Sequence, residues 1–224
     1  GSVAADPWGI RLSNMFHMSN DSGEFRIFSD VSSLPPLALP NLFGDSTASY
    51  YPLYEAKMMN AYTHRYGDFS DSGHKRAHIL PEVGLDRLKD PDFEPMPYYW
   101  VSKEMMDSWA RHVGWKYQWY LGWRNITDSR ASARTVVASV LPDSGIGNSI
   151  NIMMPDFQTH GLRVAGLISN LSALVLDFIA RKKVGGLNLN FFTMKQFAFL
   201  PPAFYTEPRL AFITPKVLEL TYTS

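Results

Sequence analysis

Side chains of the types that hydrogen-bond to DNA gather between residues 123 and 202. This stretch holds eight lysines and arginines against four acidic residues, a net charge of +4, whereas the rest of the neutral chain sums to −4. Arginine pairs with guanine, asparagine and glutamine pair with adenine, and lysine, serine and threonine hold phosphates. Composition alone favours a simpler interpretation, a solvated face beside a core helix, so a DNA assignment needs further evidence.

A second feature is the basic run Arg181-Lys182-Lys183, which is followed by the glycine pair Gly185-Gly186. Three bases at the end of a helix complement its dipole, so ordinary capping is one explanation. The other is that two glycines let the backbone approach a polyanion closely, with amides free to bind phosphate. The residues alone leave both open.

Motifs for catalysis are missing from the sequence. It has no Gly-x-Gly loop for a nucleotide or methyl donor, no phosphate-cradling loop, no serine nucleophile elbow and no Asn/Asp-Pro-Pro-aromatic tetrapeptide. The absence of cysteine excludes disulfides, cysteine-based zinc sites and a cysteine nucleophile. His74 and His78 are four residues apart in a polar loop with no third ligand nearby, so we expect no metal site. The sequence therefore predicts no catalysis by this chain itself.

The elements that would position these residues are strands and helices in mixed order. Strands are predicted at 24–28, 98–101, 117–124 and 135–141, with a turn at 145–148 and a proline-rich connector at 34–40. Helices are predicted at 54–64, at 103–112 with Ser102 as N-cap, and at 162–182, where the glycine pair ends the helix. An apolar stripe predicts that the last helix is buried, through these residues: Val164, Leu167, Leu171, Leu174, Val175, Phe178.

The expected fold class is α+β, with a mixed or antiparallel curved sheet and helices packed on one side. Residues 1–50 are interpreted as an N-terminal connector with edge elements, and residues 51–224 as the main domain. Residues 67–97 are interpreted as a long surface loop insertion. No apolar stretch is long enough to span a bilayer, and no signal segment is visible, so we expect a cytoplasmic protein without membrane contact. The sequence stops in mid-pattern, which favours a truncated C-terminus.

Three ordered blocks carry a resemblance to a known family. They are PLYEAKMMNAYTHRYGDF at 52–69, WRNITDSRASARTVVASVLPDSGIGNSINIM at 123–153, and LISNLSALVLDFIARKKVGGLNLNFFTMKQFAFLPP at 167–202. Together they resemble the C-terminal target-recognition region of type IIG-like N6-adenine DNA methyltransferases, a group that includes restriction-modification enzymes and the BREX and DISARM phage-defence methylases. Ala56, Thr63, Ala133 and Leu187 depart from the family pattern, which puts any specific role of those positions in doubt.

The resemblance implies that this region holds double-stranded DNA for a separate catalytic domain. That domain of the parent methyltransferase would bind S-adenosylmethionine and flip the adenine, so we expect no cofactor here. Motif positions shared by proteins that read different sites are expected to contact the DNA backbone: Lys57, Arg65, Arg124, Arg134, Thr135, Lys183, Gly185, Gly186, Lys195. Less patterned polar positions are the candidates for reading bases: Asn125, Asp128, Ser129, Arg130, Ser132, Asn188, Asn190.

Two alternatives belong to other functional classes. An interaction module would use the aromatic stretch 115–123 and the proline-rich segments to dock the methylase core or another defence-system subunit. A hydrolase based on His64 or His160 is the weaker alternative, because no motif places a nucleophile or a carboxylate beside either histidine.

Overall fold

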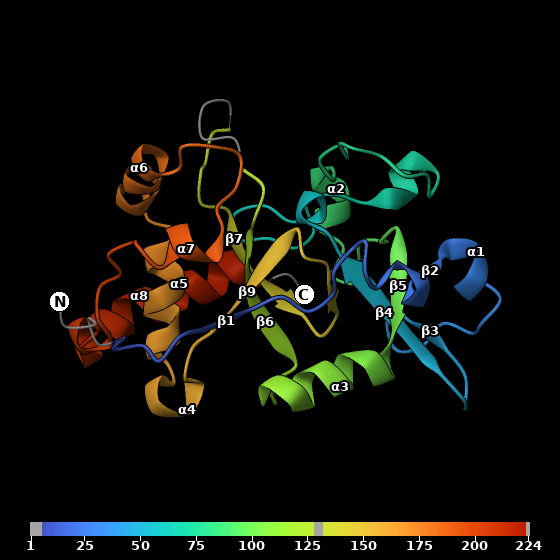
Figure 1. The fold of residues 1–224 in the computed structure, drawn as a ribbon, viewed down its shortest axis with the longest axis horizontal. Coiled ribbons are helices and arrows are strands. Elements are labelled where there is room, and N and C mark those ends of the chain that lie inside the picture. Colours follow the sequence, from blue (N-terminus) through green and yellow to red (C-terminus); the bar gives the residue numbers. More distant parts are fainter. Residues whose placement is uncertain (1–5, 128–131, 223–224) are drawn as a thin grey trace.

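Strands β6 (Trp119–Arg124) and β9 (Ile150–Met154) form the centre of an antiparallel sheet. The edges are β1 (Arg11–Ser13) and β7 (Ala138–Pro142), in the order β1-β9-β6-β7 (Figure 1). This computed structural model describes residues 6–127 and 132–222. The first sheet therefore joins an N-terminal strand to strands from the second half of the chain.

A second sheet lies beside the first. Its strands follow the order β2 (Arg26–Ile27), β5 (Tyr99–Ser102), β4 (Ser49–Tyr54) and β3 (Phe43–Gly44), all antiparallel. The short strand β8 (Gly145–Ile146) follows β7 directly and pairs in parallel with β4, so the chain crosses here from one sheet to the other. A Cβ on Gly145 would lie 2.5 Å from Val101 Cγ1, so only glycine fits this crossing.

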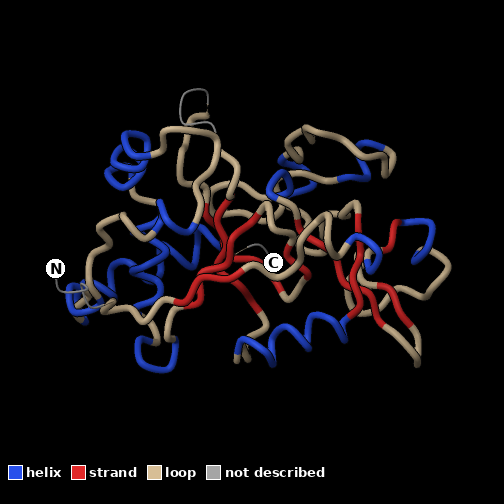
Figure 2. Tube along the Cα trace, in the orientation of Figure 1, coloured by secondary structure: helices blue, strands red, loops and turns tan. Residues whose placement is uncertain are grey.

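Helices cover one side of the first sheet, as Figure 2 shows in blue. The α-helices are α1 (Phe28–Val31), α2 (Leu85–Leu88), α3 (Lys103–Val113), α4 (Phe157–His160), α5 (Arg163–Leu171), α6 (Leu174–Lys183), α7 (Phe191–Met194) and α8 (Glu207–Thr221). Short 3-10 helices span Ser22–Glu24, Ala56–Met58, Phe69–Ser72 and Pro202–Phe204. The α+β fold class with curled antiparallel sheets is confirmed.

Side chains on the central strands alternate between two cores. Leu121, Trp123 and Met153 point into a helix-side core with residues of α5, α6 and α8. Tyr120 and Ile152 point the other way, into an inter-sheet core shared with β4, β5 and α3. The alternation follows from the two-residue repeat of a strand. Sheet β1-β9-β6-β7 is therefore buried on both faces.

Helix α3 forms as its sequence predicts. The Ser102 hydroxyl accepts a hydrogen bond from the Met105 amide at 3.4 Å, and Gly114 ends the helix in the left-handed region at φ 69°. Both are standard ways of satisfying backbone groups at helix ends. Local signals were sufficient to place this element.

The predicted helix at 54–64 is wrong. Tyr54 ends strand β4, and only Ala56–Met58 form a 3-10 turn. Tyr54 pairs with Ile146 in β8, and Met58 and Met59 are fully buried, so tertiary pairing and burial override helix propensity. The turn predicted at 145–148 also differs, because its first two residues form β8.

The predicted helix at 162–182 is broken into α5 and α6, which bend by 54° at residues 172–173. The break turns Leu176, Asp177 and Ala180 inward and leaves Leu174 and Phe178 exposed, so the second half of the predicted apolar stripe is wrong. No single helix within residues 6–127 and 132–222 is long and apolar enough to cross a membrane; α5 and α6 meet that criterion only as a bent pair.

The segment predicted as a surface insertion, 67–97, is anchored to the body. Phe69, Leu80 and Val83 are buried, at 0%, 5% and 2% exposure. Arg76 pairs with Glu55, and Arg87 pairs with the buried Asp68. Apolar side chains and ion pairs together fix this segment against the inter-sheet core.

Candidate nucleic-acid interface

Two segments from different blocks of the sequence meet in a short antiparallel pairing at the end of β6. The Thr127 amide donates to the Leu187 carbonyl at 2.7 Å, and the Leu189 amide donates to the Asn125 carbonyl at 2.7 Å. The loop after β6 and the loop after α6 therefore run side by side, as Figure 1 shows at the upper edge of the sheet.

This pairing rests on the first sheet. The Leu189 carbonyl accepts hydrogen bonds from Trp123 Nε1 at 2.8 Å and from Asn151 Nδ2 at 3.3 Å. Leu189 is fully buried, whereas its neighbours Asn188 and Asn190 are exposed. Strands β6 and β9 thus hold the backbone while the asparagine side chains remain outside.

Helix α6 supplies a second anchor. The buried Asp177 carboxylate accepts the backbone amides of Thr135 and Val136, each at 2.8 Å. One turn later Arg181 donates to the carbonyls of Ser132 and Ala133, at 2.9 and 3.0 Å. These contacts fix the entry to β7, which is why the strand predicted from residue 135 begins only at 138.

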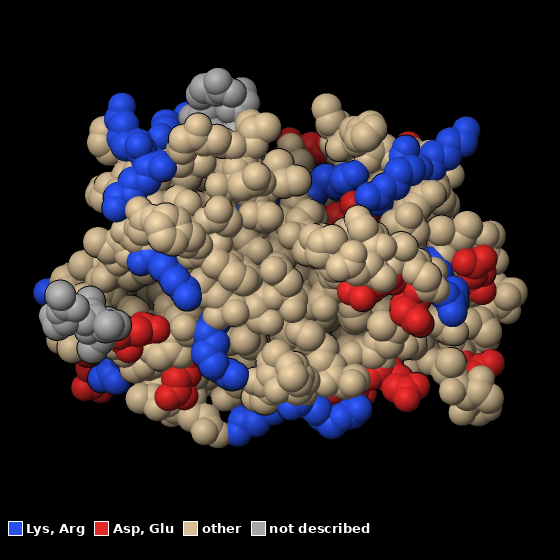
Figure 3. Space-filling model, viewed as in Figure 1, with Lys and Arg blue, Asp and Glu red and all other residues tan. Residues whose placement is uncertain are grey.

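The exposed residues around this pairing are basic, amide-bearing or apolar. We call them the paired-loop surface: Ile126, Lys182, Lys183, Gly185, Gly186, Leu187, Asn188, Asn190, Phe192, Lys195. Between residues 178 and 206 the chain carries four lysines and arginines and no acid. Figure 3 shows basic side chains gathered over α6, with no acidic side chain visible among them on that face. The described part of this surface therefore carries net positive charge.

Lys183 is held in place on this surface. Its Nζ donates to the Gln196 carbonyl at 3.0 Å, which ties the end of α6 to the residues after α7. Asn190 caps α7, because its Oδ1 accepts the Thr193 amide at 2.9 Å. Gly185 and Gly186 are exposed, and a Cβ on either would meet no atom within 4 Å. Packing therefore does not require glycine at either position.

Several predicted phosphate ligands lie elsewhere and face inward. Arg65 is 2% exposed and donates to the Asp90 carbonyl at 2.6 Å. Arg124 donates to the Met59 carbonyl and lies over the Tyr66 ring, and burial lowers the pKa of its guanidinium. These two side chains brace the body in this conformation instead of presenting charge to solvent.

Lys57 and Thr135 are likewise engaged internally. Lys57 Nζ donates to the Ala77 carbonyl at 2.6 Å, and burial lowers the pKa of its ammonium group. Thr135 is fully buried beside Asp177. Of the predicted phosphate ligands, only the group around α6 and α7 is exposed: Lys183, Gly185, Gly186, Lys195.

The remaining predicted positions divide between anchored and undescribed residues. Arg134 is partly buried, and its Nη1 has no hydrogen-bond partner among the described residues. Asn125 uses its backbone in the pairing and buries its side-chain oxygen, and Ser132 holds Arg181. Asp128, Ser129 and Arg130 lie outside the described residues.

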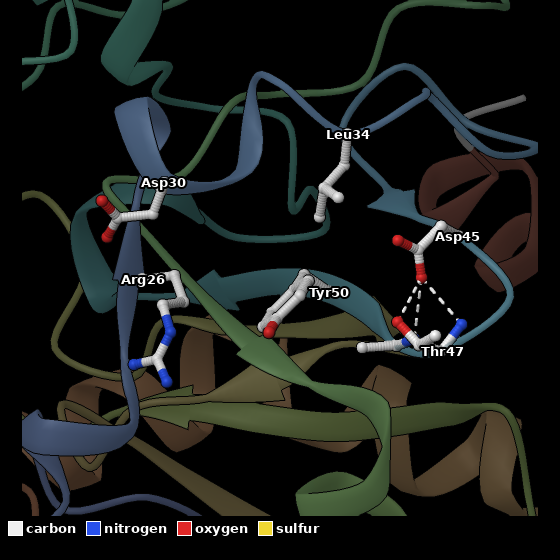
Figure 4. A pocket seen from close by; sticks show the side chains of 7 residues that line it. Arg26, Asp30, Leu34, Asp45, Thr47 and Tyr50 are labelled. Carbon is white, nitrogen blue, oxygen red and sulfur yellow. Dashed lines mark hydrogen bonds between the residues drawn. The ribbon is translucent and has the colours of Figure 1, made fainter.

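Three of the hollows on the described surface border strands of the two sheets. One of about 450 Å³, drawn in Figure 4, is lined by Arg26 of β2, Tyr50 of β4, and Asp45 and Thr47 of the turn between β3 and β4. The Asp45 carboxylate accepts from the Thr47 hydroxyl at 2.6 Å, and these hydrogen bonds lower its pKa. Asp45 Oδ1 therefore stabilises the β3–β4 turn.

The other two hollows lie along β1. A hollow of about 590 Å³ has Trp8, Met153 and Phe197 on its walls and Lys195 at its edge, so it borders the paired-loop surface. A third, of about 390 Å³, is lined by Trp115 and Phe157 among other residues. Both hollows combine buried core side chains with exposed residues on their walls.

The histidines have structural surroundings. His74 stacks on Phe28 with ring centroids 4.0 Å apart, His160 contacts Trp8 edge-on at 5.2 Å, and His64 Nε2 lies 3.8 Å from Glu94. Within residues 6–127 and 132–222, no group of three histidine or acidic side chains is arranged to hold a metal ion.

Sequence reasoning missed Asp177 and Ile126 as residues that shape this surface. Asp177 could have been noticed, because an acid within an apolar helical stripe needs a buried partner. Ile126 offered no comparable signal, since its exposure depends on the pairing with Asn188, 62 positions later. No family model, curated protein or solved structure matches this chain.

Proposed function

We propose that this protein is a DNA target-recognition domain of an N6-adenine DNA methyltransferase. In this proposal the paired-loop surface contacts double-stranded DNA. Methyl transfer belongs to a separate domain of a restriction-modification or phage-defence protein in the cytoplasm. The chain itself performs no catalysis and needs no cofactor.

The observation that carries the proposal is the meeting of two blocks of the resemblance on one basic surface. Segments 125–127 and 187–189 come from different blocks, and their pairing puts Asn188 among Lys182, Lys183 and Lys195. Lysines position the phosphate backbone, and exposed amides are suited to base edges. This combination suits duplex DNA better than it suits a small substrate.

The direct test is a fluorescence-anisotropy titration of the chain with short duplexes at several salt concentrations. Each phosphate contact lowers the slope of log K against log salt by roughly 0.9. Salt-dependent binding is expected. Salt-insensitive binding, or no binding at high protein concentration, would contradict the proposal.

A matched pair of lysines locates the surface. Lys183→Ala is expected to weaken binding to all duplexes alike. It should also make the slope of log K against log salt less steep by about 1, the amount that one phosphate contact contributes. Lys116→Ala removes an exposed lysine next to α3, away from the paired-loop surface, and should leave both quantities unchanged. If both variants change the affinity and the salt slope equally, the proposal that the paired-loop surface contacts DNA is contradicted.

The alternative is an interaction module that docks the methylase core or another defence-system subunit. Its predicted aromatic stretch does not suit it, because Trp115 and Trp123 are buried. Exposed apolar residues on α6 favour it instead: Leu174, Val175 and Phe178 are 74%, 72% and 63% exposed. Binding to purified methylase core, lost in Val175→Asp and accompanied by no duplex affinity, would select this alternative.

A further inference from the structure

We infer that Ile126 and Asn188 together read one A·T base pair in the DNA major groove. The inference rests on the proposed function and adds which base pair is read and by which side chains. Ile126 belongs to none of the positions predicted from the sequence to contact DNA.

The two residues face outward side by side. Ile126 lies directly opposite Asn188 in the antiparallel pairing. Opposed residues in such a pair project to the same face, with Cβ atoms about 5 Å apart. Burial of the residues that follow the pair agrees, because Thr127 and Leu189 are 5% and 0% exposed while Ile126 is 59% exposed; Leu187, which precedes Asn188, is 51% exposed.

An A·T pair offers complementary groups to this combination. In the major groove adenine presents N7 as an acceptor and its N6 amine as a donor, and thymine presents its C5 methyl. An asparagine amide can bond to both adenine groups, while an aliphatic side chain packs against the methyl. An amide beside an isoleucine therefore matches both bases of the pair at once.

Asn188 is the asparagine of the paired loops that is available for this role. Its side chain makes no hydrogen bond within the described residues, whereas Asn190 Oδ1 already caps α7 and Asn125 Oδ1 is buried. A two-stranded ribbon fits into the major groove, so this pairing is of a suitable width.

The surroundings supply the backbone contacts that such reading requires. Three exposed lysines belong to the paired-loop surface: Lys182, Lys183 and Lys195. Gly185 and Gly186 have no side chains that would keep a duplex away from the paired loops. Trp123 and Asn151, on the central strands of the first sheet, hold the paired loops in place by donating hydrogen bonds to the Leu189 carbonyl. The pair is therefore fixed by the first sheet and flanked by phosphate-binding charge.

The first experiment selects duplexes from a randomised library with the full chain, and repeats the selection with Asn188→Ala. The wild-type consensus is expected to contain an A·T position that the variant no longer specifies, with a loss of about 5- to 150-fold in discrimination there. Asn20→Ala, at an exposed asparagine outside the paired-loop surface, should retain the wild-type consensus. Circular dichroism checks that each variant is folded.

The second experiment changes the DNA and leaves the protein intact, so it does not depend on how a variant folds. Replacing thymine by deoxyuracil at the assigned position removes one methyl group and should weaken wild-type binding about fourfold. Ile126→Ala should be insensitive to this change, whereas Ile79→Ala, at another exposed isoleucine, should remain sensitive. Replacing adenine by 7-deazaadenine should weaken wild-type binding but not that of Asn188→Ala.

The outcomes separate the inference from the proposed function. If the wild type binds no duplex, the proposed function fails and the inference fails with it. If the wild type selects a consensus but Asn188→Ala keeps every A·T position of it, the function stands and the inference is overturned. Salt-dependent binding that selects no consensus would contradict both target recognition and the inference. Equal loss on deoxyuracil in wild type and Ile126→Ala would also overturn it.

Discussion

The carboxylate of Asp177 connects a helix to the start of a strand. It is 6% exposed and accepts two backbone amides, from Thr135 and Val136. A buried charge of this kind is tolerated because its hydrogen bonds replace water. Together with Arg181, this side chain holds α6, and with it the basic end of that helix, against the start of β7.

Removal of this carboxylate should destabilise the protein. Asp177→Ala leaves two buried amides without their acceptor and removes the carboxylate 3.8 Å from Arg181, so we expect the free energy of unfolding to fall by about 3 kcal/mol. Urea denaturation followed by circular dichroism measures the change. Asp86→Ala, at a fully exposed acid, should stay within about 0.5 kcal/mol of wild type. Similar losses in both variants would show that Asp177 has no special role.

Tyr120 should make stability depend on alkaline pH. Its burial, with Asp143 nearby, raises the pKa of its hydroxyl well above the ordinary value near 10. The unfolded chain therefore loses this proton first, so stability is intact below pH 10 and is lost as the pH rises from there towards the folded-state pKa. Above pH 10, the free energy of unfolding of Tyr120→Phe should therefore fall less steeply with pH than that of the wild type. The difference is up to about 1.4 kcal/mol per pH unit.

Urea denaturation at pH 9, 10 and 11 tests this dependence. Tyr222→Phe serves as the control, because Tyr222 is 75% exposed and its removal should leave the pH profile unchanged. Identical profiles for wild type and Tyr120→Phe would refute the assignment.

At the scale of elements, two glycines in the α5–α7 region have opposite surroundings. A Cβ on Gly166 in α5 would lie 2.5 Å from the Tyr205 ring, whereas one on Gly186 would meet nothing within 4 Å. Gly166→Ala should gain about 1 kcal/mol of helix propensity but lose about 2 to 3 through overpacking, a net loss. Gly186→Ala should change stability by less than about 0.5 kcal/mol. Thermal unfolding measures both, and a stabilised Gly166→Ala would contradict the packing described.

Elements with local signals were predictable from the sequence, and elements that depend on distant partners were not. Ser102 and Gly114 mark the ends of α3, so that helix could be placed within one residue. Residues 54–64 contain good helix formers, yet Tyr54 becomes a strand residue because β8, some 90 positions later, pairs with it. The break between α5 and α6 depends on Asp177 reaching Thr135, which no local pattern contains.

The candidate site shows the same division. Lys183, Lys195, Asn188 and Asn190 are exposed, as a DNA-contact surface requires. Arg65 is a motif position of the resemblance and a predicted phosphate ligand, but its guanidinium lies over the Phe93 ring inside the body. Charge and motif position identify residue types, whereas exposure is decided by packing between segments that are distant in sequence.

At the scale of the whole molecule, one sheet serves two cores. Leu121 and Ile152 lie on neighbouring strands but point to opposite faces. Leu121→Ala and Ile152→Ala should therefore each lower the free energy of unfolding by about 2 to 5 kcal/mol. Both should act on the same cooperative unfolding transition. Near-ultraviolet dichroism of the tryptophans, which lie in both cores, should report one transition in wild type and in each variant. Two separate transitions would show that the cores unfold independently.

The pairing of β1 with β9 has a consequence for how the chain reaches this fold. Arg11 is opposite Met154, so the first strand has no partner until the chain beyond residue 154 has been synthesised. At common rates of translation that interval is on the order of ten seconds. Contacts between such distant residues also slow folding, because a large loop must close first. Among the described strands, β1 therefore waits longest during synthesis for the strand that it pairs with.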